Sequence, residues 1–282
     1  MLGSLGGIFL QVIGSDRLAS MTIAIIGAGN MGGAVLAGLL EAGRDPQSVI
    51  VVEAREEQAA ALRDKHGIRT LSAEEAVAQS DVVVLGVKPY GVVPVLESIA
   101  SSLREGTTVV SLAAGVPTSA MEPAVPDGVS VVRVMPNTPA LVGAGMSAVA
   151  GGANATPEAV ETAADLMNAV GTVITVPESQ IDAVTAISGS GPAYVFMIAE
   201  AWIEAGVHLG LTRDDATTLV IETLTGSAEL LRSGTHPALL REQVTSPGGT
   251  TAAALGALER NGLRAAFLEA TRAAYVRSQE LS

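Results

Sequence analysis

The spacing of three glycines after one short apolar run constrains the fold more than any other feature. Residues 22–26 form a β-branched run, and Gly27, Gly29 and Gly32 follow it in the pattern G-x-G-x-x-G, ahead of helical periodicity over residues 31–42. Gly27 permits a tight turn, Gly29 lets the backbone approach a pyrophosphate, and Gly32 lets the helix pack on the strand. The segment predicts a dinucleotide site at a helix N-terminus. A strand–turn–helix unit without a ligand is the alternative.

Short β-branched runs then alternate with segments of helical periodicity. The runs cover residues 22–26, 49–52, 82–85, 108–112, 129–134, 146–150 and 172–176, and the helical segments cover residues 31–42, 56–66, 91–103 and 157–169. This alternation predicts a parallel sheet with helices on both faces. The expected fold class is therefore an α/β N-terminal domain, Rossmann-type and doubly wound, with a different domain after it.

That second domain is all-α. Beyond Pro177 no strand pattern remains, and helical periodicity runs from Pro192 to about Leu281. We expect residues 21–178 to form the dinucleotide-binding Rossmann domain and residues 179–282 to form a helical domain for dimerisation and substrate binding.

The helical segment 192–209 is apolar on most sides despite Glu200 and Glu204. Such a helix is buried by something, most simply by a second subunit, so self-association is expected. The two glutamates interrupt the longer apolar run, and no transmembrane helix is predicted. Residues 1–20 lack the basic residues that precede the apolar part of a signal peptide, and we expect them to be a disordered N-terminal extension.

The composition of the chain limits the classes of binding partner that we expect. The formal net charge of −13 argues against non-specific binding to nucleic acid or anionic membranes, which leaves small molecules. The chain has no cysteine, hence no disulfide, thiolate zinc site or cysteine nucleophile, which fits a reducing cytoplasm. The three histidines, His66, His208 and His236, show no metal-ligand spacing, so no metal is expected.

Candidate cofactor residues continue beyond the glycines. Asn30 and Met31 lie within the motif at the start of its helix. Glu53 ends the next strand, 21 positions after Gly32, where an acidic residue usually binds the ribose 2′-hydroxyl and repels a 2′-phosphate. Arg55 follows and either holds that phosphate or is a solvated charge facing the neighbouring glutamates. NADPH and NADH are both compatible with this pattern.

Further candidates follow two other strands. Val87, Lys88 and Pro89 come after residues 82–85, and the carboxyl ends of strands are where a doubly wound sheet binds its ligand. Lys88 is one of only two lysines, and we expect it to face an anion, as both a cofactor-binding and a catalytic candidate. Asn137 lies in a turn with paired prolines. Its amide is expected either to fix a nicotinamide ring or substrate, or to make an Asx turn.

A second glycine-rich loop, V-T-S-P-G-G-T-T at residues 244–251, opens an alanine-rich helix near the C-terminus. Its hydroxyls and the free amides of a helix N-terminus suit a carboxylate. No lysine occurs after Lys88, so this domain cannot supply the lysine acid of a hydroxyacid dehydrogenase that carries one there. Reduction of a C=N bond remains compatible with such a site, because an imine nitrogen can bind already protonated and then needs no strong general acid.

Five segments together closely resemble Δ1-pyrroline-5-carboxylate reductase, the last enzyme of proline biosynthesis. They read I-I-G-A-G-N-M-G, V-V-L-G-V-K-P, R-V-M-P-N-T-P-A-L-V, I-S-G-S-G-P-A-Y-V-F and V-T-S-P-G-G-T-T, in that order. The resemblance spans about residues 21–281 and implies a Rossmann domain followed by a helical domain that dimerises, often assembling further into decamers. It also implies that the substrate loop of one subunit faces the Rossmann crevice of the other.

The resemblance assigns roles to the second loop by position. Thr251 would hydrogen-bond the ring nitrogen of the substrate and is the other catalytic candidate. The remaining substrate-binding candidates are Ser246 and the backbone of Gly248, Gly249 and Thr250 for the carboxylate, and Val244 for the ring pocket. Glu53 departs from the Ser or Thr of many relatives, so the family's usual preference for NADPH over NADH is open here.

The implied reaction is NAD(P)H-dependent reduction of 1-pyrroline-5-carboxylate to L-proline, with the protein contributing mainly orientation and electrostatics. Two rivals remain. One is a reductase of another cyclic or acyclic imine. The other is a regulatory protein that binds NAD(P)H without turnover.

Overall fold

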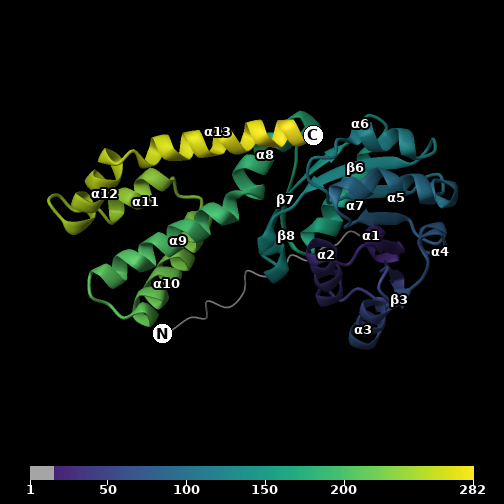
Figure 1. The fold of residues 1–282 in the computed structure, drawn as a ribbon, viewed down its shortest axis with the longest axis horizontal. Helices are drawn as coiled ribbons and strands as arrows, with labels where there is room; N and C mark the ends of the chain where they lie inside the picture. Colours follow the sequence, from purple (N-terminus) through teal and green to yellow (C-terminus); the bar gives the residue numbers. More distant parts are fainter. Residues whose placement is uncertain (1–15) are drawn as a thin grey trace. The chain divides into compact units, whose positions relative to one another are not determined.

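The computed structural model, drawn in Figure 1, describes residues 16–282. Its strands form one eight-stranded sheet in the order β3-β2-β1-β4-β5-β6-β7-β8. The strands are β1 (Ile23–Ile26), β2 (Val49–Val52), β3 (Arg69–Thr70), β4 (Val82–Leu85), β5 (Thr108–Ser111), β6 (Ser130–Met135), β7 (Gly145–Gly151) and β8 (Gly171–Thr175). The reversal of order between β1 and β4 makes the crevice at their carboxyl ends the expected ligand position of a doubly wound sheet.

The sheet is parallel, as predicted, except at one pairing, that of β7 with β6. Strands β1 to β6 run parallel, but β7 pairs antiparallel with β6, and β8 then pairs parallel with β7. The physical reason is the length of the connection. A parallel crossover needs a dozen or more residues, whereas β6 and β7 are joined by a short segment built around the 3₁₀ turn η5 (Thr138–Val142).

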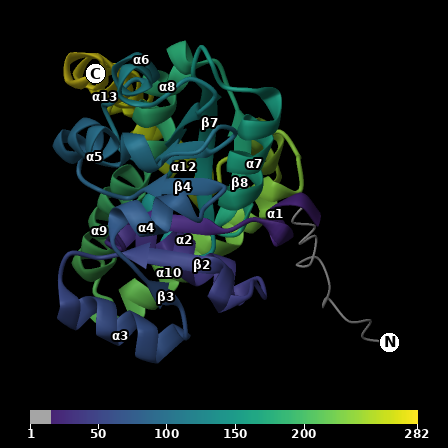
Figure 2. The same cartoon turned by 90° about the vertical axis from the view of Figure 1, so that its right-hand side faces the viewer.

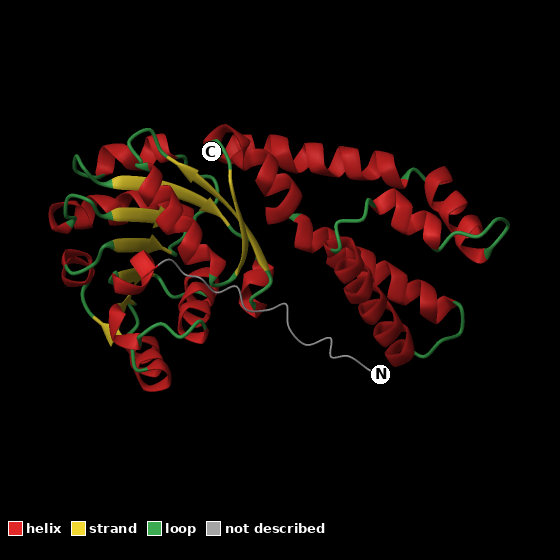
Figure 3. Ribbon diagram, turned by 180° about the vertical axis from the view of Figure 1, so that it is seen from behind, coloured by secondary structure: helices red, strands yellow, loops and turns green. Residues whose placement is uncertain are grey.

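Helices cover both faces of the sheet, as predicted, and Figure 3 shows them on either side of the strands. They are α2 (Asn30–Glu41), α3 (Glu56–His66), α4 (Ala73–Ala78), α5 (Val92–Ile99), α6 (Thr118–Met121) and α7 (Pro157–Asn168). One buried cluster joins Ile23 and Ile25 of β1 to α2 and α7, and the other joins Ala24 and Ile26 to α4, α5 and α6. Alternate residues of a strand thus feed opposite layers, and each fully buried Ile stabilises the fold by about 1.5–3 kcal/mol.

The segment before β1 differs in part from the expected disorder. Residues 1–15 lie outside the described residues, but α1 (Asp16–Ser20) is helical. Its Leu18 is buried in the same cluster as α2 and α7, and the Leu18 carbonyl accepts a 2.8 Å hydrogen bond from Arg44 Nη1. The burial of Leu18 and this backbone hydrogen bond hold α1 in place. The sequence around Leu18 is polar and did not predict that this segment would be ordered.

Residues Ser190–Ala274 form a second compact unit, which is entirely helical. Its helices are α9 (Gly191–His208), α10 (Arg213–Arg232), α11 (Pro237–Gln243), α12 (Thr250–Arg260) and most of α13 (Leu263–Leu281). Helices α9 and α10 pack through buried Ala199, Ala216 and Val220. The first unit, called the sheet unit below, comprises the described residues up to Gly189 together with Tyr275–Ser282, and the second is called the helical unit.

This division differs from the expected boundary at residue 178. Helix α8 (Ile181–Val184) and the π-helical turn η7 (Thr185–Gly189) belong to the sheet unit. Ile181 is buried against Ala148 and Ala150 of β7. Helical structure therefore begins about one helix before the second compact unit does.

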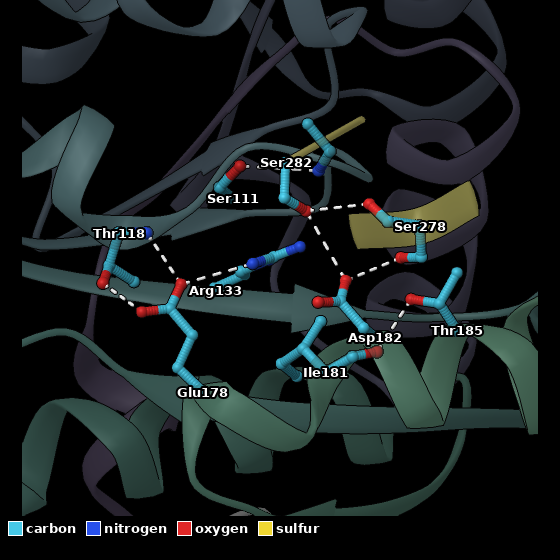
Figure 4. A network of polar contacts seen from close by, with 10 residues as sticks. Ser111, Thr118, Arg133, Glu178, Ile181, Asp182, Thr185, Ser278 and Ser282 are labelled. Carbon is cyan, nitrogen blue, oxygen red and sulfur yellow. Dashed lines mark hydrogen bonds and ion pairs between the residues drawn. The ribbon is translucent and has the colours of Figure 1, made fainter. Parts of the chain in front are cut away.

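Polar contacts hold the segment from Glu178 to Asp182 and the end of α13 within the sheet unit (Figure 4). Glu178 accepts hydrogen bonds from the backbone N–H of Thr118 (2.7 Å) and its hydroxyl (2.5 Å), and its Oε1 lies 3.4 Å from Nη1 of buried Arg133. Asp182 accepts a 2.7 Å hydrogen bond from Ser278 Oγ near the end of α13.

Much of α9 is apolar and exposed in the single chain. Phe196 is 64% exposed and Met197 72%, with Val195 and Trp202 about half exposed. Within residues 16–282, one helical run, Glu178–His208, is long and apolar enough by length and composition to cross a membrane; the mean hydropathy of its most apolar window is 1.2. The expectation that no such helix exists is therefore not met by these two criteria.

Candidate active site

The glycine-rich loop after β1 has the tight geometry that its sequence predicts. Gly27 has φ +91°, a conformation that side chains rarely adopt. A Cβ on Gly32 would collide with the Gly27 carbonyl oxygen, so α2 begins directly against the turn. These two glycines are required by the backbone itself, independently of any ligand.

Gly29 is different, because a Cβ placed there would meet nothing within 4 Å. It is the N-cap of α2 and supplies no side-chain cap, and the first turn holds no acidic residue. The first N–H groups of the helix are therefore open to an anion, while Asn30 is exposed and Met31 partly exposed beside them. This open, cap-free N-terminus fits the pyrophosphate of a dinucleotide.

The loop after β4 lies directly against the glycine-rich loop after β1. A Cβ on Gly86 would strike the Gly27 carbonyl oxygen, and Gly86 N donates a 2.9 Å hydrogen bond to Ile26 O. Sequence reasoning did not assign Gly86 to the site; its position at the end of a buried strand was the available signal. Val87 is partly exposed, and Lys88 and Pro89 are exposed at the start of η2 (Pro89–Gly91). Lys88 forms no ion pair within residues 16–282.

At the carboxyl end of β2, Glu53 and Arg55 contact each other. Oε1 of Glu53 accepts from the Arg55 backbone N–H at 3.2 Å and lies 3.5 Å from Arg55 Nε, with side chains 10% and 76% exposed respectively. Arg55 Nη2 also donates to Gln58 Oε1. Glu56 pairs with Arg63 at 2.7 Å, so the ion-pair partner of the exposed Arg55 is Glu53.

Asn137 is committed to the fold. Its Oδ1 accepts a 2.9 Å hydrogen bond from Met146 N, and its Nδ2 donates at 3.1 Å to Ser188 O. These bonds connect η5, the start of β7 and the π-helical turn η7, which is a wider bridge than an Asx turn. The second N–H of the amide and the second lone pair of Oδ1 are left to meet a cofactor or substrate, so the predicted ring-fixing role would depend on those two groups.

The second glycine-rich loop ends in another helix N-terminus with no side-chain cap. Gly248 has φ +68°, and Gly249 is the N-cap of α12 with no acidic residue in the first turn. Ser246 Oγ lies so close to Gly249 that a Cβ on Gly249 would collide with it. This places a hydroxyl beside the open N–H groups of Thr250 and Thr251, a combination that suits a carboxylate. Val244 is exposed, at 66%, just before the loop.

Not every hydroxyl of that loop is available. Thr245 Oγ1 donates a 2.6 Å hydrogen bond to Arg241 O and so stabilises the end of α11. Thr250 and Thr251 make no comparable side-chain bond within the described part of the chain, and Thr251 is partly exposed. The loop lies in the helical unit, whereas the dinucleotide candidates all lie in the sheet unit. No group of three or more His, Asp or Glu residues that could hold a metal occurs in residues 16–282.

Comparison with known proteins identifies the family. Residues 178–281 match the model for pyrroline-5-carboxylate reductase dimerisation, and residues 22–115 match the model for NADP oxidoreductase, coenzyme F420-dependent. A pyrroline-5-carboxylate reductase of Corynebacterium melassecola is 46% identical, with 92% of this chain and 98% of that protein covered. The chain belongs to the pyrroline-5-carboxylate reductase family. The Escherichia coli (strain K12) member is 40% identical over 92% of this chain and 98% of its own length.

Solved structures of the same family agree in fold. A pyrroline-5-carboxylate reductase from Coxiella burnetii superposes with a TM-score of 0.89 at 38% identity, covering 93% of this chain and 99% of the other. A Plasmodium falciparum pyrroline carboxylate reductase with NADP bound has a TM-score of 0.81 at 30% identity, covering 93% and 98%. Family membership and the α/β plus helical architecture predicted from the sequence are confirmed.

Proposed function

We propose that this chain reduces 1-pyrroline-5-carboxylate to L-proline with NAD(P)H, the last step of proline biosynthesis. The proposal rests on two helix N-termini, those of α2 and α12, whose N-cap residues are Gly29 and Gly249. Neither helix has a side-chain cap, and neither has an acidic residue in its first turn. An enzyme that binds a dinucleotide together with a small amino-acid-like substrate needs two such anion-binding sites, one for the pyrophosphate and one for the carboxylate.

When bound, the reduced nicotinamide would supply a hydride to the imine carbon, which is C2 of the pyrroline ring and becomes C5 of proline. The protein's own contribution is to hold the two reactants about 3–3.5 Å apart. Ser246 Oγ and the first N–H groups of α12 would hold the substrate carboxylate, and Val244 would line the ring pocket. Thr251 Oγ1 would hydrogen-bond the ring nitrogen and keep it oriented as its charge changes. Lys88, which follows β4 and forms no ion pair within residues 16–282, would serve an anionic part of the cofactor.

Self-association completes the proposal. The dimerisation segment contains the exposed apolar face of α9, and we propose a second copy of this chain, in preference to lipid, as its cover. Glu200 and Glu204 are expected to lie at the wet margin of that interface, where Glu204 already pairs with Arg213 at 2.8 Å. A dimer in the cytoplasm is the expected form, with further assembly into decamers as the larger alternative.

The rivals predict different behaviour in one assay. Purified protein should oxidise NADPH or NADH only when pyrroline-5-carboxylate is added, and the product should be L-proline. Oxidation with another imine but not with pyrroline-5-carboxylate would identify the related reductase. Dinucleotide binding without oxidation by any imine would identify the regulatory protein.

A further inference from the structure

A chain of side-chain contacts runs from the carboxyl end of β2 to the glycine-rich loop. Arg55 contacts Glu53, Arg55 Nη2 donates to Gln58 Oε1, and Gln58 Nε2 donates at 3.5 Å to the carbonyl oxygen of Ala28 inside the G-x-G-x-x-G motif. All of these residues belong to the sheet unit, and Figure 2 shows α3, which carries Gln58, beside β3 and β2.

The position of Gln58 explains why it reaches Arg55. Arg55 is the N-cap of α3, and Gln58 is its third helical residue. A Glu or Gln at that position commonly bends back to the N-cap backbone. Here the Gln58 side chain meets the guanidinium instead, and its other end is anchored on Ala28. Gln58 is partly buried, whereas Arg55 is exposed, so the glutamine is the better fixed partner.

Other carboxylates near Arg55 could compete for its guanidinium, so the contact with Gln58 is important for holding it in place. Glu56 is held by Arg63, but Glu57 is exposed in the same first turn and makes no ion pair within the described chain. A released Arg55 side chain could exchange between Glu53 and Glu57 through solvent. Glu53 would then present an uncovered negative charge to whatever binds at the end of β2.

We propose that Gln58 is a positioning residue for dinucleotide choice, holding the Arg55 guanidinium between Glu53 and the glycine-rich loop, where it can pair with a ribose 2′-phosphate. This inference depends on the proposed function only for the class of cofactor, a nicotinamide dinucleotide. In this arrangement Arg55 offsets the repulsion between Glu53 and a 2′-phosphate, and the uncharged 2′-hydroxyl of NADH does not require it. A chain with an acidic residue at the end of β2 thereby accepts both cofactors.

Calorimetry on the ligand-free protein tests this without turnover. Adenosine 2′,5′-bisphosphate and AMP differ only in the 2′-phosphate, so their affinities isolate its recognition. Gln58→Leu should weaken the bisphosphate about tenfold and leave AMP within about twofold, because the group lost positions a charged hydrogen bond. Gln47→Leu is the matched control, since Gln47 also donates its side-chain amide to a backbone carbonyl, that of Gly67 at 2.7 Å. It should change neither affinity.

A double-variant cycle then shows whether Gln58 acts through Arg55. In an Arg55→Ala background, Gln58→Leu should cause no further loss of bisphosphate binding. Equal losses for both nucleotides would assign Gln58 to general loop structure and overturn the proposal, as would additive losses in the cycle or an unchanged Gln58→Leu protein. Failure of the proposed reductase function would appear separately, as intact nucleotide binding without imine-dependent oxidation.

Discussion

Ser278 Oγ donates a 2.7 Å hydrogen bond to Asp182 Oδ1, joining the end of α13 to α8 across 96 positions of sequence. Ser278 is buried, and both residues belong to the sheet unit although the helical unit lies between them in the chain. The contact is therefore a long-range tie that keeps the C-terminal turn on the sheet.

Ser278→Ala should lower the free energy of unfolding of the sheet unit by about 1.5–3 kcal/mol, the usual value for a hydrogen bond to a charged group. Thermal or urea unfolding measures it. Ser98→Ala is the control, because Ser98 makes only an exposed bond to the Val95 carbonyl within its own helix. Equal stability of the two variants would mean that Asp182 is satisfied by other donors.

Gly86→Ala should weaken dinucleotide binding at least tenfold and lower the melting temperature. The added Cβ would press on the Gly27 carbonyl, and overpacking a rigid contact costs about 1–3 kcal/mol. Gly91→Ala is a matched control in the same loop region, since its Cβ would meet nothing closer than Val87 at 3.8 Å. Fluorescence titration with NADPH distinguishes them, and similar affinities would remove Gly86 from the site.

Arg55→Ala should raise the Michaelis constant for NADPH selectively, by a factor corresponding to about 1.5–3 kcal/mol. Steady-state kinetics with both cofactors measures the change, and equal effects on NADH and NADPH would show that Arg55 does not reach a 2′-phosphate. Glu53→Ser should shift preference the other way, toward NADPH, because it removes the carboxylate that a 2′-phosphate must approach.

Thr251→Ala should lower turnover with little change in cofactor affinity, since its hydroxyl is expected to serve the substrate nitrogen and not the dinucleotide. Thr251→Ser retains the hydroxyl and should be milder. Turnover and cofactor dissociation constants, measured on the same preparations, separate the two effects. Wild-type turnover in Thr251→Ala would mean that another group holds the ring nitrogen.

Mixed dimers test whether an active site is shared between subunits. Gly29→Glu should place a carboxylate where the open space beside Gly29 would admit pyrophosphate, and Ser246→Ala with Thr251→Ala should disable the substrate loop of another chain. Co-refolding the two inactive proteins should recover part of the activity, because some sites would pair two intact halves. Verified mixed dimers without activity would show that each site lies within one chain.

Local patterns predicted most of the sheet unit, because its elements are defined by residues that are neighbours in sequence. Predicted residues 49–52, 82–85 and 56–66 coincide with β2, β4 and α3. The short strand β3 and helix α4 were missed. Two residues carry almost no strand periodicity, and α4 is fixed by its Ser72–Glu75 capping box more than by an apolar stripe.

The remaining differences involve contacts that sequence spacing does not encode. The antiparallel pairing of β7 follows from a short connection, and the bridge made by Asn137 depends on where Met146 and Ser188 are placed by other elements. Gln58 showed no sequence signal of its own, because its role depends on two side chains folding back over one helix start. The glycines were easier to predict, because the positive φ angles at Gly27 and Gly248 restrict those positions to glycine directly.

The return of Tyr275–Ser282 to the sheet unit has a consequence for a protein whose backbone has been cut. A single protease cleavage between Ser190 and Ala274 would give two fragments that each retain a piece of the sheet unit. The C-terminal fragment would still be held by Asp182, and by the close approach of Leu281 to Gly115. Nicked protein should therefore migrate as one species in native conditions and as two only after denaturation, and the two fragments expressed separately should be able to reassemble.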